Sequence, residues 1–250
     1  MKESMLQVKG LTKRYGENCV VDQISYEVKV GEILGFLGPN GAGKSTTIKM
    51  ITGIEDYDAG EVAILGKRQE RITKEFCQML GVVPQDIAVY SDLSAYDNVK
   101  FFCSLYGYTR KELADRVEEA LKFVGLWDNR KERPCKFSGG MKRRLNIACS
   151  IAHSPKLLIM DEPTVGIDPQ SRNYILEAIK VLNQRGTTVI YVSHYMEEIE
   201  SLCNRIIIMD HGKILVDMSK NELKAQYEKL GLNGLEEIFL SITGKELRDK

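Results

Sequence analysis

The stretch GPNGAGKST, from Gly38 to Thr46, has the residue types of a phosphate-binding loop. It fits the pattern G-x-x-x-x-G-K-[ST], and it lies between an apolar run typical of a strand and a pattern typical of a helix. The glycines allow close approach to phosphate oxygens, Lys44 adds a positive charge, and the Ser45 hydroxyl can ligate Mg²⁺. A plain glycine-rich turn is disfavoured by this context. The residues expected to bind a nucleotide are Gly38, Pro39, Asn40, Gly41, Ala42, Gly43, Lys44, Ser45 and Thr46.

A pair of carboxylates, Asp161 and Glu162, follows the run LLIM, which is typical of a buried parallel strand. Ligands of parallel sheets bind beyond the carboxyl ends of the strands, so this pair is expected at the ligand-binding edge. Asp161 is placed to hold Mg²⁺, and Glu162 to orient and deprotonate a water that attacks the γ-phosphate. Taken alone, an acidic pair at a strand end also fits a solvated turn.

The stretch KFSGGMKRRLNIA, Lys136 to Ala148, indicates a second anion site. Its serine and two glycines lead into a helical pattern, and the first N–H groups of a helix attract anions because they lack partners within the helix. The alternative is an ordinary capped helix with Ser138 as the N-cap. Since a phosphate loop is already present, the sequence raises the question of what a second such site serves.

Composition excludes several classes of protein. The 250 residues, 43% hydrophobic and 28% charged, suffice for a globular protein with a sizeable core. The 35 basic and 35 acidic residues give no overall field that would attract nucleic acid or an anionic membrane. The six cysteines, without a C-x-x-C pair, and the absence of a signal-peptide pattern indicate reduced thiols in a cytosolic protein. No apolar run approaches the roughly 18 residues that cross a bilayer.

Strand patterns occupy both ends of the chain, and helical patterns the middle. A helix is expected from about Lys44 to Ile51, and TRKELADRVEEALKFVGL is typical of an amphipathic helix. A last helix and a charged tail are expected at 234–250. Strands are expected at ISYEVKV (24–30), EILGFLG (32–38), EVAILG (61–66), LGVVPQ (80–85), KLLIMDE (156–162), TTVIYVSH (187–194) and RIIIMDHGKILV (205–216).

This alternation predicts an α/β fold with an inserted helical lobe. We expect a single domain over 1–250. Its ATP-binding core would comprise 1–85 and 155–220, its helical subdomain 86–154, and its C-terminal helical tail 221–250.

The phosphate loop, the SGG stretch and LLIMDEP occur in the order found in the nucleotide-binding subunits of ABC transporters, and the chain resembles that family from about Leu6 to Asp217. The resemblance implies a P-loop NTPase (RecA-like) core, an N-terminal antiparallel β subdomain and the inserted α-helical subdomain. It implies ATP and Mg²⁺ as cofactors and ATP hydrolysis coupled to transmembrane transport. In this family two subunits pack head to tail around two ATP molecules, so Ser138, Gly139 and Gly140 would contact the nucleotide of the partner.

The resemblance assigns four further positions singly. Tyr15, in LTKRYG, would stack on adenine, unless it is an ordinary strand-end tyrosine. Gln85, in VVPQ, would touch Mg²⁺ or the attacking water and link the lobes. Asp168, in VGIDP, would meet the opposite P-loop, although an Asp before a proline is also a plain helix start. His194 would contact the γ-phosphate as a switch histidine, and we expect the other two histidines to be surface or core residues.

Details of the motifs resemble ABC-2 type subunits, most of which serve exporters. The stretches SGGMKRRLNIA, EPTVGIDPQSR and LEEIFLSITG carry this likeness. The family usually has LSGGQ at this point, and this chain has Phe137 in place of the leucine and Met141 in place of the glutamine. Met141 cannot make the hydrogen bonds of a glutamine side chain. Export is therefore favoured, while the cargo is left open.

The resemblance also implies partners and a location. The chain would lie at the cytoplasmic face of the cell membrane, bound to a separate integral membrane permease, as a homodimer or beside a related ATPase. We expect the permease to dock in a groove between the lobes, near Gln85 and the segment IAVYSDLSAYDNVKFF, where charge substitutions at Val89 and Tyr90 would test it. No nucleic acid is expected.

Two rival functions also fit parts of the sequence. A soluble ATPase of the same family, acting on ribosomes or nucleic acid, would use the basic run Lys142, Arg143 and Arg144. Such a run on a helix is usually a solvated face, and Arg144 matches a structural arginine of the family. A regulatory module that binds ATP without hydrolysis is disfavoured, because the phosphate-loop lysine, both carboxylates and the switch histidine are all present.

Overall fold

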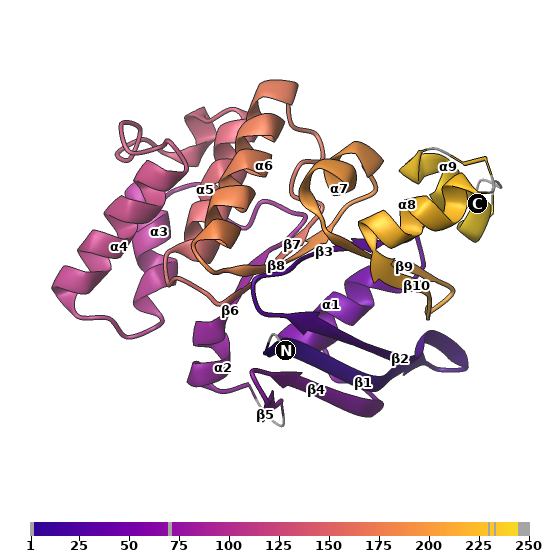
Figure 1. Ribbon diagram of the computed structural model, residues 1–250. Coiled ribbons are helices and arrows are strands. Elements are labelled where there is room, and N and C mark those ends of the chain that lie inside the picture. The colour runs from indigo at the N-terminus through magenta and orange to yellow at the C-terminus, as the bar shows by residue number, and fades with distance from the viewer. Residues whose placement is uncertain (1–2, 70–71, 230, 233, 245–250) are drawn as a thin grey trace. The chain divides into compact units, whose positions relative to one another are not determined.

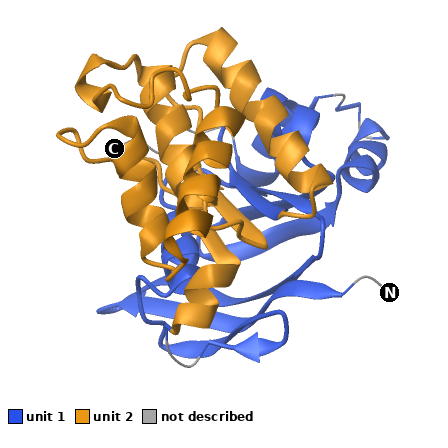
Figure 2. Ribbon diagram, turned by 90° about the vertical axis from the view of Figure 1, so that its left-hand side faces the viewer, with its two compact units in different colours: residues 1–72, 188–250 blue, residues 73–187 orange. Residues whose placement is uncertain are grey.

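The computed structural model describes residues 3–69, 72–229, 231–232 and 234–244. The chain forms two compact units, residues 1–72 with 188–250, and residues 73–187 (Figure 2). We describe each unit by itself. Among the residues described, no helix combines the length and apolar character needed to cross a bilayer.

The first unit contains two sets of strands (Figure 1). One is a four-stranded antiparallel sheet in the order β2, β1, β4, β5, which confirms the predicted N-terminal antiparallel β subdomain. In the other set β3 pairs in parallel with β8 and β9, and β10 pairs antiparallel with β9. The strands are β1 Ser4–Tyr15, β2 Asn18–Lys29, β3 Ile33–Leu37, β4 Ala59–Ile64, β5 Lys67–Arg68, β8 Thr188–Val192, β9 Arg205–Asp210 and β10 Lys213–Ser219.

Burial explains why these segments are strands. All residues of β3 and β8 are buried, as expected for central parallel strands, whose patterns are continuous apolar runs. The predicted strand at 24–30 is the second half of β2, which begins earlier than its alternating pattern indicated. The helices of this unit are α1 Lys44–Thr52, α7 Met196–Leu202, α8 Lys220–Glu228 and α9 Leu235–Thr243. The charged tail predicted after α9 falls on 245–250, outside the described residues.

The second unit combines a parallel strand pair with helices. Strands β6 and β7 pair in parallel, and helices α3, α4 and α5 pack against one another. The predicted amphipathic helix is α4, which begins at a capping box of Thr109 and Glu112 and buries Val117 and Leu121. The elements are α2 Lys74–Met79, β6 Leu80–Val83, α3 Ala95–Ser104, α4 Arg110–Phe123, a 3-10 turn Pro134–Lys136, α5 Gly139–Ile151, β7 Leu157–Asp161 and α6 Pro169–Gln184.

Candidate functional site

The phosphate loop lies in the first unit, between β3 and α1, as predicted. Two of its glycines are required by close packing. A Cβ on Gly38 would overlap the carbonyl oxygen of Met209, and a Cβ on Gly43 would lie 2.6 Å from the carbonyl oxygen of Val20. Gly43 also has a φ of +102°, which disfavours any residue with a side chain. The backbone of β2 and β9 therefore fixes the path of the loop.

The start of α1 fits a bound phosphate. Gly43 is its N-cap, no side chain caps it, and its first turn holds no acidic residue, so no carboxylate of that turn competes with an anion for its N–H groups. The buried Lys44 side chain folds over the loop and donates to the carbonyl oxygens of Gly38, at 2.7 Å, and Pro39, at 3.0 Å. Ser45, in the first turn, is exposed. A cationic amine and the first N–H groups of a helix thus lie together on one short loop.

Two other predicted residues belong to this unit. Tyr15 ends β1, is 48% exposed, and donates its hydroxyl hydrogen to the Glu55 carboxylate. His194 follows β8 and is exposed, with its ring centroid 4.3 Å from that of Tyr195. Both side chains are thus accessible to a ligand.

A buried carboxylate supports the loop that carries His194. Glu198, on α7, accepts hydrogen bonds from the hydroxyls of Tyr191, at 2.8 Å, and Ser193, at 3.0 Å. The Ser193 hydroxyl in turn accepts a bond from the backbone N–H of Tyr195 at 3.0 Å. Sequence reasoning missed this network. The available signal was an acidic residue four positions after the histidine, because a side chain at that spacing lies close to the residues at the start of the helix.

In the second unit, the predicted carboxylates lie at the end of β7. Its first four residues are buried, and Asp161 and Glu162 emerge at its carboxyl end. Glu162 has a φ of +46°, an unfavourable conformation for a residue with a side chain, and such strain concentrates at functional sites. The Gln85 amide donates a hydrogen bond to a Glu162 carboxylate oxygen at 3.2 Å. The unit therefore brings together two residues that lie far apart in sequence.

Arg143 holds the loop that carries Gln85. This buried side chain of α5 donates to the carbonyl oxygens of Pro84, at 2.8 Å, and Gln85, at 2.6 Å. Arg144 donates to the carbonyl oxygen of Val124 at 2.9 Å. The interpretation of the basic run as a solvated face is therefore wrong for Arg143, while the bond of Arg144 agrees with the structural role that the family resemblance implied for it. The signal was present, because Arg143 shares the buried helix face of Gly140 and Ile147, three and four residues away.

The SGG stretch opens α5, as the sequence indicated. The Ser138 hydroxyl accepts a bond from the N–H of Met141 at 3.2 Å, so the capped-helix interpretation holds, while Ser138 and Gly139 remain exposed. Asp168 caps α6 in the same way and accepts from the N–H of Ser171 at 2.9 Å. That backbone hydrogen bond is the main reason why the pKa of Asp168 is lowered.

The starts of α5 and α6 lie against each other. A Cβ on Gly140 would overlap the Ser171 hydroxyl oxygen and would lie 3.2 Å from a carboxylate oxygen of Asp168. Gly139 is open, since its nearest neighbour would be the carbonyl oxygen of Gly166 at 4.0 Å. The structure thus places together the two stretches that the family resemblance assigned to the nucleotide of a partner.

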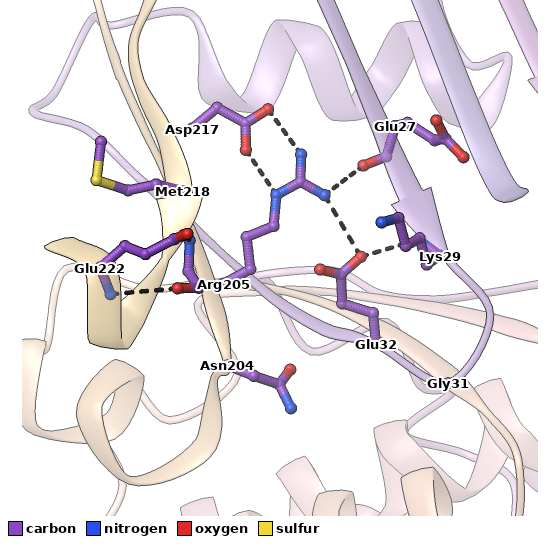
Figure 3. A pocket seen from close by; sticks show the side chains of 10 residues that line it. Glu27, Lys29, Gly31, Glu32, Asn204, Arg205, Asp217, Met218 and Glu222 are labelled. Carbon is purple, nitrogen blue, oxygen red and sulfur yellow. Dashed lines mark hydrogen bonds and ion pairs between the residues drawn. The ribbon is translucent and has the colours of Figure 1, made fainter. Parts of the chain in front are cut away.

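A cleft in the first unit has a volume of about 640 Å³ and is lined by none of the predicted residues (Figure 3). Arg205 donates to both carboxylate oxygens of Asp217, at 2.6 and 2.7 Å, and to the carbonyl oxygen of Glu27 at 2.6 Å. These bonds tie β9 to β10 and β2. We therefore treat the cleft as structural.

The donor chemistry fits Mg²⁺, which prefers hard oxygen ligands. The predicted set consists of the Ser45 hydroxyl in the first unit and the Asp161 carboxylate and Gln85 amide in the second. Gln85 donates to Glu162 through its nitrogen, so its oxygen would be the ligand atom.

Comparison with known proteins identifies the family. The model of the ABC transporter family matches residues 21–165, more than half of the chain. The chain belongs to the ABC transporter family. The matched region includes the phosphate loop, Gln85, the SGG stretch and the carboxylate pair.

Curated relatives and a solved structure agree. The linearmycin resistance ATP-binding protein LnrL of Bacillus subtilis is 48% identical over 94% of this chain and 78% of that protein. The Nod factor export ATP-binding protein I of Cupriavidus metallidurans is 37% identical over 88% of this chain and 73% of that protein. A dimeric ATP-binding cassette in a post-hydrolysis state, bound to ADP and Pi, is 27% identical with a TM-score of 0.78, over 86% of this chain and 98% of that one.

The predicted fold class and activity are thereby confirmed. The chain is an α/β P-loop NTPase, and it is the ATP-binding and ATP-hydrolysing subunit of an ABC transporter. The rival prediction, a soluble ATPase acting on ribosomes or nucleic acid, finds no support in these comparisons.

Proposed function

We propose that this chain powers an exporter by hydrolysing ATP at a site in which Glu162 is the general base and Gln85 positions it. The observation that carries the proposal is the hydrogen bond between these two side chains at the carboxyl end of β7. It joins a candidate base to a loop whose next three residues, 86–88, are exposed, and such a link suits an enzyme whose nucleotide state must affect a partner protein.

The residues of the site then have separate roles. Lys44 and the N–H groups of α1 bind the phosphates, because both present positive charge on one loop. Glu162 takes the proton of the attacking water, and His194 contacts the γ-phosphate. Bound Mg²⁺, held by Ser45, Asp161 and Gln85, would neutralise charge on the phosphates. Tyr15 offers its half-exposed ring to the adenine.

The second anion site serves a second nucleotide. Ser138, Gly139, Gly140 and Asp168 contact the ATP bound to another subunit, which places two ATP molecules in a head-to-tail dimer. The start of α5 supports this, since its N-terminus favours an anion, Ser138 and Gly139 are exposed, and the start of α6 lies beside it. Either a second copy of this chain or a related ATPase fits.

A cluster of aromatic side chains suits a membrane partner. Tyr90 is 49% exposed, and its ring lies 5.1 Å from that of Phe101 and 5.9 Å from that of Phe102. The buried Asn98 fixes this segment, because it accepts from the N–H of Tyr90 at 2.7 Å and donates to its carbonyl oxygen at 2.9 Å. We call Tyr90, Phe101 and Phe102 the aromatic cluster and assign it to a separate permease.

The segment before the cluster is held by the helix that carries the SGG stretch. The N–H of Ala88 donates to the buried Asn146 of α5 at 3.2 Å, and Arg143 of α5 holds the carbonyl oxygen of Gln85. A partner seated on the aromatic cluster would therefore act on both Gln85 and α5. The subunit would lie on the cytoplasmic face of the membrane. The boundaries predicted for the core, 1–85 with 155–220, and for the helical subdomain, 86–154, remain part of the proposal.

Export is inferred from the relatives, since one is named for resistance and one for export of a Nod factor. We assign the contacts with the cargo to the permease.

Isolation of the tagged chain from detergent-solubilised membranes of its own cell tests this function. We expect a stoichiometric multi-span protein, identified by mass spectrometry. Tyr90→Glu should release it, whereas Val181→Glu, on the 37% exposed Val181 of α6 in the same unit, should not. Ribosomal proteins or nucleic acid in place of a membrane protein would overturn the transport function, and equal recovery with Tyr90→Glu would remove the aromatic cluster as the docking site.

A further inference from the structure

The end of β1 is fastened to the loop that follows α1. The backbone N–H of Asp58 donates to the carbonyl oxygen of Thr12 at 2.9 Å, and the N–H of Arg14 donates to the Asp58 carboxylate at 2.6 Å. The Lys13 ammonium donates to the carbonyl oxygen of Asp56 at 2.6 Å. This loop starts at Gly53, where α1 ends in a left-handed conformation. The strand that carries Tyr15 and the helix that starts at the phosphate loop are thus joined.

Lys13, Tyr15 and Glu55 form a closed set of three contacts within this junction. The Tyr15 hydroxyl donates to the Glu55 carboxylate. The Lys13 ammonium lies 3.6 Å from the same carboxylate and 5.4 Å from the centroid of the Tyr15 ring. The ring is therefore held at its hydroxyl by an anion and at one face by a cation. Two separate contacts of this kind fix the plane of the ring.

Packing gives no reason for this arrangement. Tyr15 is 48% exposed, whereas the side chains of Lys13 and Glu55 are only 13% and 21% exposed. Partial burial of an ion pair costs desolvation free energy, and the paired charges here support a tyrosine that is itself not buried. The result of the arrangement is a half-exposed aromatic ring in a defined orientation.

The same junction places the ring near the nucleotide loop. The hydrogen bond to Glu55 is the main reason why the pKa of Tyr15 is raised, and the nearby Thr46 side chain acts in the opposite direction. Thr46 lies in the first turn of α1, two residues after Lys44. The Tyr15 hydroxyl therefore lies beside the helix end that binds phosphate.

We propose that Glu55 and Lys13 are positioning residues that hold the Tyr15 ring in the plane that stacks on the purine of ATP. The inference rests on the proposed stacking role of Tyr15. Stacking on an aromatic side chain depends on the relative orientation of the two planes, so a ring that rotates freely binds a base less well. Glu55 thus contributes to the affinity for the base and not to the affinity for the phosphates.

Calorimetric titration with two probes, ATP and inorganic triphosphate, tests this. Glu55→Ala should weaken ATP binding about threefold to tenfold, the value of one hydrogen bond, and leave triphosphate binding unchanged. Glu55→Gln, which keeps an acceptor for the hydroxyl, should restore most of the affinity. Tyr15→Phe should resemble Glu55→Ala, and the double variant should be no weaker than either single one. Asp56→Ala is the matched control, because only the backbone carbonyl of Asp56 takes part.

The outcomes separate this inference from the function on which it rests. If Tyr15→Ala weakens ATP binding but Glu55→Ala does not, stacking stands and the positioning role is overturned. If Tyr15→Ala leaves ATP binding unchanged, the stacking role itself fails. Equal weakening of ATP and triphosphate by Glu55→Ala would show that the substitution damages the phosphate loop, and this too would overturn the inference.

Discussion

The side-chain amide of Gln85 donates a hydrogen bond to the Glu162 carboxylate over 3.2 Å. The two residues follow β6 and β7, which pair in parallel, so the register of the strands brings them together. Glu162 is also held at a φ of +46°. A strained backbone and a directed hydrogen bond at one carboxylate are what a base with a fixed orientation requires.

Glu162→Gln should bind ATP, but its rate of hydrolysis should fall by at least about 100-fold, because an amide cannot accept the proton of the attacking water. Release of phosphate under single-turnover conditions measures this step. The variant should also sediment as a dimer with ATP and Mg²⁺ and as a monomer with ADP. Turnover near the wild-type rate would remove Glu162 as the base, and a monomer under both conditions would remove the dimer for the isolated subunit.

Lys44→Ala should weaken ATP binding by about tenfold or more, since it removes a charged hydrogen-bond donor from the phosphate loop. Lys49→Ala is the matched control, because Lys49 lies in the last turn of the same helix and is exposed. Titration with ATP compares the two variants. Equal binding by both would show that the lysine bonded to Gly38 and Pro39 does not reach the nucleotide.

Local patterns predicted most of the fold. Each stretch proposed as a strand forms strand structure, because buried parallel strands have continuous apolar runs, and α4 has its apolar residues at helical spacing. The stretch 205–216, however, is two antiparallel strands, β9 and the first part of β10. The short helices α2 and α7 were not predicted. They are only six and seven residues long, too short for a periodic pattern.

The motifs predicted the site, but not what holds it. The roles of Arg143 and Glu55 depend on partners that only folding brings near, such as the carbonyl oxygen of Pro84, 59 residues from Arg143. A charged residue on a helix usually faces solvent, so composition alone favoured the wrong interpretation of Arg143. Its burial follows from the carbonyl oxygens that require a donor.

Gly140→Ala should lower the free energy of unfolding by about 1–3 kcal/mol, because the added methyl group would overlap Ser171. Gly139→Ala is the matched control, since its Cβ would meet only an atom at 4.0 Å. Urea unfolding of both variants measures the difference. If the Gly139 and Gly140 variants were equally stable, the starts of α5 and α6 would not be packed as described.

His153 gives the protein a pH dependence of stability that the motifs did not predict. Its ring is buried, lies 4.0 Å from that of Tyr106, and donates from Nε2 to the carbonyl oxygen of Leu80 at 3.0 Å. Burial, opposed by the bond to Leu80 and assisted by the positive charge of Arg116, lowers the pKa of His153 from 6.5 to about 4. The folded protein therefore keeps this side chain neutral where the unfolded chain is already protonated.

The sign of the effect follows from that difference. The contribution of neutral His153 to the free energy of unfolding is complete above pH 6.5 and is lost as the pH falls toward 4. In this range only the unfolded state takes up the proton. Between pH 6.5 and 5 the loss is about 2 kcal/mol. His153→Gln should be less stable at pH 7 and should show a smaller decrease in the free energy of unfolding over this range. His211→Gln, at a histidine whose side chain is 81% exposed, should keep the wild-type slope. Since carboxylates titrate over the same range, the decisive quantity is the difference in slope between the two variants, and equal slopes would contradict a neutral His153.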